Sequence, residues 1–373
     1  MANKKILIVS GEPSGDLHAS NLVKDLKSLN PALQFYGIGG ELSKRAGVDI
    51  IFDITKLALV GLVDVIKHIS VVKKAHDAVI AKLETDPPDM AILVDYPGFN
   101  LRLERALKKA GYKGLLIHYI CPTVWAWGKK RIGIMERNLD LLLTIFPFEK
   151  ECFKKSRLIV HYTGHPLVDK LQAYSYLQAE GAQNIIALFP GSRKAEIEKN
   201  LPLQLQIARR LQKKHPHLKI MVSCAEDRLK ESIGYEKDWL QIGPLESYPL
   251  KERIKLAIAT SGTVTLELAL LGIPSIVTYA ISRLDCFLAQ KIFKINLPFY
   301  CIVNIIMKQE VYPEFFGPRF TEDRAYEAAM KLIENSLYCQ EKCLEMKNLL
   351  ESAKEKDAAA HILNLEVHWD IPK

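Results

Sequence analysis

The sequence predicts an α/β protein made of two Rossmann-like domains whose parallel sheets face a cleft. Short, nearly continuous apolar runs alternate with amphipathic helical segments, which indicates parallel strands covered on both faces. Both halves of the chain open with a strand, a glycine-containing turn and a helix. The length of 373 residues is more than one ordinary core needs and suits two domains.

In the first half, strand-like segments alternate with helical ones. The strand "KKILIVS" leads through "GEPSGD" into the helical "LHASNLVKDLKSL", and "DMAILVD" leads through "YPGFN" into "LRLERALKKAG". The third strand, "GLLIHYI", follows directly. Gly164 and Pro166 then interrupt the pattern, so we assign residues 1–168 to the first domain.

The second half repeats the arrangement. The strand "NIIALFP" leads through "GSR" into the long helical "KAEIEKNLPLQLQIARRLQKKHP", and the strand "LKIMVSC" follows. Next come "KLAIATS", the helical "GTVTLELALLG" and the strand "PSIVTYA". We assign residues 169–340 to the second domain. The sequence leaves open whether the helices of about 340–373 pack back onto the first domain.

Composition narrows the class of protein. A charged fraction of 25% and an apolar fraction of 49% are typical of soluble globular chains, and no run of about 18 apolar residues is present. The apolar stretch at the N-terminus is too short for a signal peptide, so we expect a cytoplasmic protein. The seven scattered cysteines indicate reduced thiols. The net charge of +8, spread over short basic pairs, favours phosphates or a lipid surface as partners and not nucleic acid.

The stretch "ALFPGSRKAEI" ends a strand and begins a helix. Backbone N–H groups at a helix N-terminus point towards an anion, and the helix dipole stabilises it. Gly191 and Ser192 allow close backbone approach, and Arg193 can bind a phosphate with two N–H groups. The pattern therefore favours a diphosphate site, with an ordinary strand–helix turn as the alternative.

A second turn of this kind lies in "TSGTVTLELALLG". Ser261, Gly262 and Thr263 follow a strand and offer further donors to phosphate. Glu267 lies one turn into the helix, where its carboxylate can accept both hydroxyls of a ribose or simply complement the helix dipole. Two such turns in one domain favour a nucleotide site.

The first domain contributes acidic residues at the ends of its strands. Glu12 and Asp16 lie at a helix start, where Asp16 has the alternative role of an N-cap. Asp95 ends the strand "AILVD" and precedes a Pro-Gly turn. This carboxylate either caps the next helix or acts as a general base in the cleft.

The stretch "CPTVWAWGKKR" places two tryptophans, Trp125 and Trp127, beside cations that include Lys129 and Arg131. Indole faces and cations suit a sugar and its phosphate, and packing is the alternative. The chain has no Asp-x-Asp triplet, which metal-dependent transferases of nucleotide sugars commonly carry. We therefore expect no metal ion and no cofactor, with Arg193 and the helix dipoles in their place.

An apolar helical stripe lies within residues 56–74. It is wider than a core-facing helix needs and ends in two lysines, so it suits either a membrane interface or a helix buried on two sides. Its members are Leu62, Val65, Ile66, Ile69 and Val72.

Together these stretches resemble the lipid A disaccharide synthase family. The resemblance covers most of the first 275 residues in the family's order, and it is carried by "SGEPSGD", "DYPGFN", "PTVWAWGKKR", "FPFEKECF", "TGHPLVD", "LFPGSRKAEIE" and "SGTVTLELAL". The later "LPFYCIVNIIMKQEVYPEFF" is similar through Asn304, which we add to the nucleotide-sugar contacts, and Glu314. It departs at Gly317, where the family usually has glutamine.

The resemblance implies an inverting GT-B glycosyltransferase, peripheral on the cytoplasmic face of a Gram-negative inner membrane. It would join UDP-2,3-diacylglucosamine to 2,3-diacylglucosamine 1-phosphate (lipid X), giving a β-1,6 tetraacyl disaccharide 1-phosphate and UDP. Asp95 matches the family's acidic position for the base, with Asp16 in reserve. Acyl-chain preference, the residues that grip lipid X and the oligomeric state stay open. The rival hypotheses are another UDP-sugar enzyme of this architecture, such as a UDP-N-acetylglucosamine 2-epimerase, and a non-enzymatic nucleotide-binding protein.

Overall fold

The computed structural model describes residues 4–55, 65–126, 128–172, 183–223, 240–243, 248–280, 297–317, 321–355 and 357–369. The chain divides into two compact units, Met1–Pro166 with Ala353–Lys373 and Leu167–Ser352. Helix α16 (Leu337–Ser352) belongs to the second unit and α17 (Ala358–Trp369) to the first. The chain thus returns to the first unit later than the boundary at about residue 340 that the sequence suggests.

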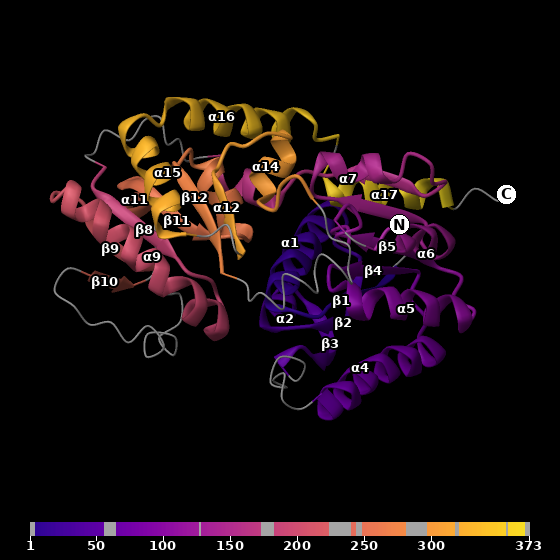
Figure 1. The fold of residues 1–373 in the computed structure, drawn as a ribbon. Helices are drawn as coiled ribbons and strands as arrows, with labels where there is room; N and C mark the ends of the chain where they lie inside the picture. The colour runs from indigo at the N-terminus through magenta and orange to yellow at the C-terminus, as the bar shows by residue number, and fades with distance from the viewer. Residues whose placement is uncertain are drawn as a thin grey trace. The chain divides into compact units, whose positions relative to one another are not determined.

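A sheet of seven strands forms the centre of the first unit, in the order β3-β2-β1-β4-β5-β6-β7 (Figure 1). Every recorded pairing in it is parallel. The strands are β1 (Lys5–Ser10), β2 (Gln34–Gly39), β3 (Val48–Asp53), β4 (Met90–Val94), β5 (Leu115–Tyr119), β6 (Leu141–Thr144) and β7 (Ile159–Tyr162).

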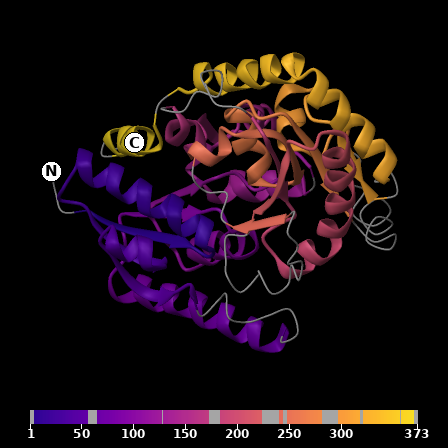
Figure 2. The same ribbon diagram turned by 90° about the vertical axis from the view of Figure 1, so that its left-hand side faces the viewer.

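The two faces of this sheet bury alternate residues of each strand. Ile6 and Ile8 pack in one core with α1 (Pro13–Leu29) and α17. Leu7 and Val9 point the other way, into a core shared with α4 (Val65–Thr85), α5 (Pro97–Lys109) and α6 (Lys130–Asn138). Because both faces are covered, the strands read as nearly continuous apolar runs, as the sequence predicts. Figures 1 and 2 show α4 on the outside of this unit.

The second unit has a sheet of six parallel strands in the order β10-β9-β8-β11-β12-β13. The strands are β8 (Ile185–Phe189), β9 (Lys219–Ser223), β10 (Leu240–Gly243), β11 (Ile254–Thr260), β12 (Ser275–Tyr279) and β13 (Glu314–Phe316). Its helices are α9 (Lys194–Lys214), α11 (Tyr248–Lys251), α12 (Thr263–Leu270), α14 (Ile302–Met307), α15 (Glu322–Glu334) and α16, with α8 (Pro166–Leu171) at the boundary.

Helices α9 and α15 cover one face of this second sheet, where Leu201, Leu205 and Ala329 join the strand residues in one core. The two parallel α/β units confirm the predicted fold class. Within the described ranges, no helix is both long enough and apolar enough to cross a membrane.

Candidate functional site

The two glycine turns of the second unit begin side by side. Strands β8 and β11 are neighbours, and Phe189 lies opposite Ala259 in their register. The turns after these strands therefore leave the same edge of the sheet at adjacent positions, and each opens a helix, α9 or α12. Carboxyl ends of parallel strands are where such sheets bind ligands, so this edge is a candidate nucleotide site.

The "GSR" turn already holds an anion, the side chain of Glu196. The N–H groups of Ser192 and Arg193 donate to Oε2 of Glu196 over 3.2 and 3.4 Å, and the Arg193 guanidinium donates to Oε1 over 3.3 Å. Gly191 has a φ of +124°, and a Cβ there would lie 2.6 Å from Oε2 of Glu196. The turn is thus shaped around a carboxylate at the start of α9, and its donors suit a phosphate oxygen equally well.

The "SGT" turn is open. Gly262 and Thr263 are exposed, and among the described residues no atom lies within 4 Å of a Cβ added to Gly262. Ser261 is tied down, since its hydroxyl donates to the carbonyl oxygen of Tyr300 over 3.2 Å. The exposed backbone at the start of α12 is therefore accessible to a ligand.

Glu267 forms an ion pair that the sequence analysis missed. Lys251 Nζ donates to Oε1 of Glu267 over 2.7 Å, with the lysine side chain 7% and the glutamate side chain 20% exposed. The two residues lie 16 positions apart on different helices, α11 and α12, so no local pattern connects them. In the sequence Lys251 is one of several charged residues in "KERIK" before and at the start of β11, so nothing there distinguishes it.

The structure gives Asn304 a structural role. Its side chain is fully buried, and Nδ2 donates to the Tyr312 carbonyl over 2.7 Å and to Glu314 over 2.6 Å. Oδ1 accepts the N–H groups of Val311 and Tyr312. All four hydrogen-bonding positions of the amide are occupied, which leaves none for a nucleotide sugar. Burial raises the pKa of Glu314, which also accepts the N–H groups of Tyr300 and Cys301 at the start of α14.

Asp95 lies in a strained turn at the carboxyl end of β4. Both Asp95 and Tyr96 have left-handed backbones, with φ of +49° and +46°. The buried Asn100 stabilises this turn, because Nδ2 donates to the carbonyl oxygens of Asp95 and Val94 over 2.6 and 3.2 Å. Non-glycine residues in this conformation are often found at functional sites.

The turn after β1 lies against the turn after β4. Ser10 and Val94 face each other in the sheet register, and a Cβ on Gly11 would lie 2.0 Å from the Tyr96 ring. Glu12, at the N-cap of α1, is exposed at this edge. The sequence therefore places Glu12 and Asp95 correctly at neighbouring strand ends.

The charge of Asp95 acts on two buried groups, Glu149 and His18. Burial raises the pKa of Glu149 to about 8, and the charge of Asp95 adds to the shift, while a hydrogen bond from the Trp125 indole opposes it. Burial also lowers the pKa of His18, against the attraction of Asp95. Burial and the nearby His18 lower the pKa of His165 to about 3. Glu149, His18 and His165 were not singled out as site residues from the sequence, although two family motifs contain Glu149 and His165.

Asp16 caps a different helix from its own. It lies buried in the first turn of α1, and its Oδ1 accepts the N–H groups of Gly40 and Ser43 over 2.8 and 3.2 Å. Oδ2 accepts the N–H of Leu42 over 3.1 Å. These donors begin α2 (Glu41–Arg45), so Asp16 caps α2 and not α1, whose N-cap is Glu12. The geometry favours this structural role over that of the reserve base.

The predicted acceptor and membrane residues are only partly described. Trp125 is half-buried, with its ring edge-to-face against Phe148 at 5.5 Å, Arg131 is partly buried and Lys129 is exposed. Val72 packs against the core of the first unit, which favours the buried-helix alternative at this position. Leu62 and Trp127 lie outside the described residues, as do the side chains of Val65, Ile66 and Ile69.

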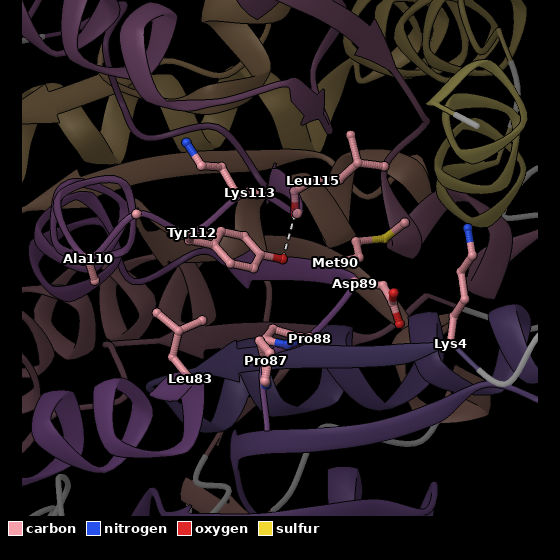
Figure 3. A pocket seen from close by; sticks show the side chains of 12 residues that line it. Lys4, Leu83, Pro87, Pro88, Asp89, Met90, Ala110, Tyr112, Lys113 and Leu115 are labelled. Carbon is pink, nitrogen blue, oxygen red and sulfur yellow. Dashed lines mark hydrogen bonds between the residues drawn. The ribbon is translucent and has the colours of Figure 1, made fainter. Parts of the chain in front are cut away.

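The first unit has two further features away from Asp95, a cavity and a cluster of two histidines with a glutamate. A cavity of about 580 Å³ lies at the amino ends of β4 and β5, with Tyr112 and Pro88 in its lining (Figure 3). This is the opposite edge of the sheet from Asp95. His161, Glu355 and His361 also gather near one another, but the two imidazoles are stacked at 4.1 Å with planes 18° apart. Their in-plane lone pairs do not converge on one ion in this arrangement.

The fold is of the GT-B class, which glycosyltransferases and UDP-sugar epimerases share. A glycosyltransferase of kitacinnamycin superposes with a TM-score of 0.66 at 11% identity, covering 98% of this chain and 100% of that chain. A putative UDP-N-acetylglucosamine 2-epimerase from Listeria monocytogenes gives 0.65 at 12% identity, covering 100% and 98%. Identities this low show the fold alone.

The chain belongs to the lipid-A-disaccharide synthetase family, whose model matches residues 6–365. The lipid-A-disaccharide synthase of Geobacter metallireducens is 35% identical over 86% of this chain and 86% of its own length. That of Coxiella burnetii is 32% identical over 91% and 92%. The protein is therefore a glycosyltransferase of lipid A disaccharide synthesis, which confirms the resemblance seen in the sequence.

Proposed function

We propose that the chain condenses UDP-2,3-diacylglucosamine with 2,3-diacylglucosamine 1-phosphate, forming the β-1,6 tetraacyl disaccharide 1-phosphate and UDP with inversion. The observation that carries this proposal is the edge of the second sheet, where two helix N-termini begin side by side and one already holds a carboxylate. That edge suits the diphosphate of a UDP sugar. The family supplies the class of reaction.

Asp95 is the general base in this proposal. Its carboxylate takes the proton of the acceptor 6-hydroxyl while that oxygen forms a bond to the anomeric carbon from the face opposite UDP. The bond between the anomeric carbon and the diphosphate oxygen breaks, and its electron pair leaves with UDP. The Asn100 hydrogen bonds support this role because they fix the turn that carries Asp95.

The second unit stabilises the leaving group. Negative charge develops on the diphosphate as the bond breaks, and the N–H groups of Ser192 and Arg193 with the Arg193 guanidinium are placed to stabilise it. Glu267 would accept the ribose hydroxyls at the start of α12. Binding of the diphosphate requires Glu196 to give up these donors.

The buried groups that interact with Asp95 carry little charge at pH 7. With its pKa raised to about 8, Glu149 is largely protonated at pH 7 and does not repel the substrate phosphate. Burial lowers the pKa of His18, so its imidazole is largely neutral at pH 7. Within the described residues its Nδ1 has no hydrogen-bond partner.

Peripheral attachment to the cytoplasmic face of a Gram-negative inner membrane is part of the same proposal. Both substrates carry acyl chains, so the enzyme has to reach lipid at a bilayer surface. Flotation with liposomes of anionic phospholipid tests this part: the protein should rise with the vesicles in low salt. Protein that stays at the bottom with acyl substrate present would contradict it.

Product analysis tests the reaction itself. The purified protein, supplied with both acylated substrates in detergent micelles, should release UDP and form a disaccharide in equal amounts, as measured by mass spectrometry. A 2-epimerase would instead convert UDP-N-acetylglucosamine without any acceptor. That outcome, with no disaccharide, would overturn the proposal.

A further inference from the structure

We propose that Lys251 is a positioning residue for the nucleotide ribose, acting through Glu267. The proposal rests on the proposed function, because it takes the start of α12 as the ribose side of a UDP site. Lys251 would hold one carboxylate oxygen of Glu267 so that the other points at the ribose hydroxyls.

The geometry of the pair supports this division of roles. Lys251 is the last residue of α11, is 5% exposed as a residue, and bonds Oε1 of Glu267 over 2.7 Å. In the described part of the chain, Oε2 of Glu267 receives no recorded hydrogen bond. The Glu267 side chain is 20% exposed, so a ligand can reach it. One oxygen is therefore held from inside the unit and the other is accessible from outside.

The opposite charges of Lys251 and Glu267 stabilise their contact. A buried ammonium without a partner is strongly unfavourable, so the bond from Lys251 holds the Glu267 side chain in one rotamer. A carboxylate accepts two neighbouring ribose hydroxyls well only when its plane is fixed, because ordering a free glutamate opposes binding. Lys251 thus prepares Glu267 before the nucleotide arrives.

The alternative is a structural tie between α11 and α12 without any effect on the ribose. The two readings differ in one measurable quantity, the preference for UDP over 2′-deoxy-UDP. A structural tie affects both ligands equally, since they share base and diphosphate. A positioning role affects only the ligand that carries the 2′-hydroxyl.

Titration calorimetry on the full chain with UDP and 2′-deoxy-UDP decides between them. We expect the wild type to bind UDP roughly ten-fold more tightly than 2′-deoxy-UDP, as one charge-assisted hydrogen bond provides. Lys251→Met should lose most of this preference, as Glu267→Gln should, while Lys251→Arg retains part of it. Lys255→Met, four residues away on β11, is the matched control and should behave as wild type.

Each failure has a separate signature. A wild type that does not bind UDP rejects the nucleotide site and with it the proposal. If the wild type binds both ligands equally, Glu267 does not recognise the 2′-hydroxyl, and the positioning role of Lys251 is rejected as well. A folded Lys251→Met protein that keeps the ten-fold preference overturns the positioning role alone. If Lys251→Met does not fold, the double variant Lys251→Met/Glu267→Gln replaces it, because it removes both charges of the pair. This double variant should bind UDP and 2′-deoxy-UDP equally. A retained preference for UDP would overturn the proposal.

Discussion

Arg193 and Glu196 form an ion pair across the first turn of α9, and the same glutamate accepts the backbone N–H groups of Ser192 and Arg193. The carboxylate thus occupies the donors that the proposed function assigns to the diphosphate. In the free protein it acts as a capping box for α9. Nucleotide binding therefore exchanges one anion for another.

This exchange predicts opposite effects for the two residues. Arg193→Ala should weaken UDP binding roughly 10- to 100-fold, because a charge-assisted hydrogen bond is lost. Glu196→Gln should strengthen UDP binding several-fold, because the neutral amide competes less well for the donors. Calorimetry measures both. Glu198→Gln, whose partner Lys194 lies 3.9 Å away in the same helix, is the control and should leave binding unchanged. Weaker UDP binding by Glu196→Gln would contradict the exchange.

Asn304 should be required for stability and not for nucleotide binding. Asn304→Ala removes four hydrogen bonds inside the second unit and leaves buried partners unsatisfied. We expect the free energy of unfolding to fall by about 2–4 kcal/mol in a urea titration. The fraction that remains folded should bind UDP as wild type does. A stable variant with weak UDP binding would restore the direct contact suggested by the sequence.

Glu149 should make stability depend on pH. Burial raises its pKa from 4.5 to about 8 in the folded protein, so the folded state binds the proton more tightly than the unfolded state. Its stabilising contribution is complete below about pH 4.5 and is lost as pH rises towards 8, by at most about 1.4 kcal/mol per pH unit.

Glu149→Gln should remove this dependence, because a neutral amide can still accept a hydrogen bond from Trp125. Urea titrations at pH 5, 6, 7 and 8 compare the two slopes. Glu151→Gln, on the exposed side of α7 (Pro147–Cys152), is the control and should keep the wild-type slope. Equal slopes for wild type and Glu149→Gln would show that Glu149 is ionised in the folded state.

Substitution of Asp16 should affect stability, whereas substitution of Asp95 should affect catalysis. Asp16→Asn keeps one acceptor oxygen for α2 and loses the other, so it should lower the melting temperature by several degrees while the folded enzyme stays active. A stable, inactive Asp16→Asn protein would instead make Asp16 the base.

The fold was accessible from sequence because each strand and helix carries its own local pattern. Strands such as "AILVD" are continuously apolar because both faces of the sheet are buried. The Gly191 turn is also local, because its contact is with Glu196, five positions further along the chain. The prediction that these turns meet at one sheet edge needed only the parallel topology.

The contacts that tune the site were not accessible in this way. Glu267 meets Lys251 from another helix, and Glu149 meets Trp125 across 24 positions of sequence. Burial and partner identity, which local patterns do not report, decide the roles of Asp16 and Asn304. The stripe that includes Val72 is ambiguous for the same reason, since an apolar helix face suits a core and a membrane equally.

The most direct test of the account compares wild type with Asp95→Asn in the micelle assay for disaccharide and UDP. We expect disaccharide from the wild type and a loss of roughly 100- to 10,000-fold in kcat for the variant, with UDP affinity unchanged. An Asp95→Asn enzyme that keeps most of the wild-type kcat would contradict the assignment of Asp95 as the general base.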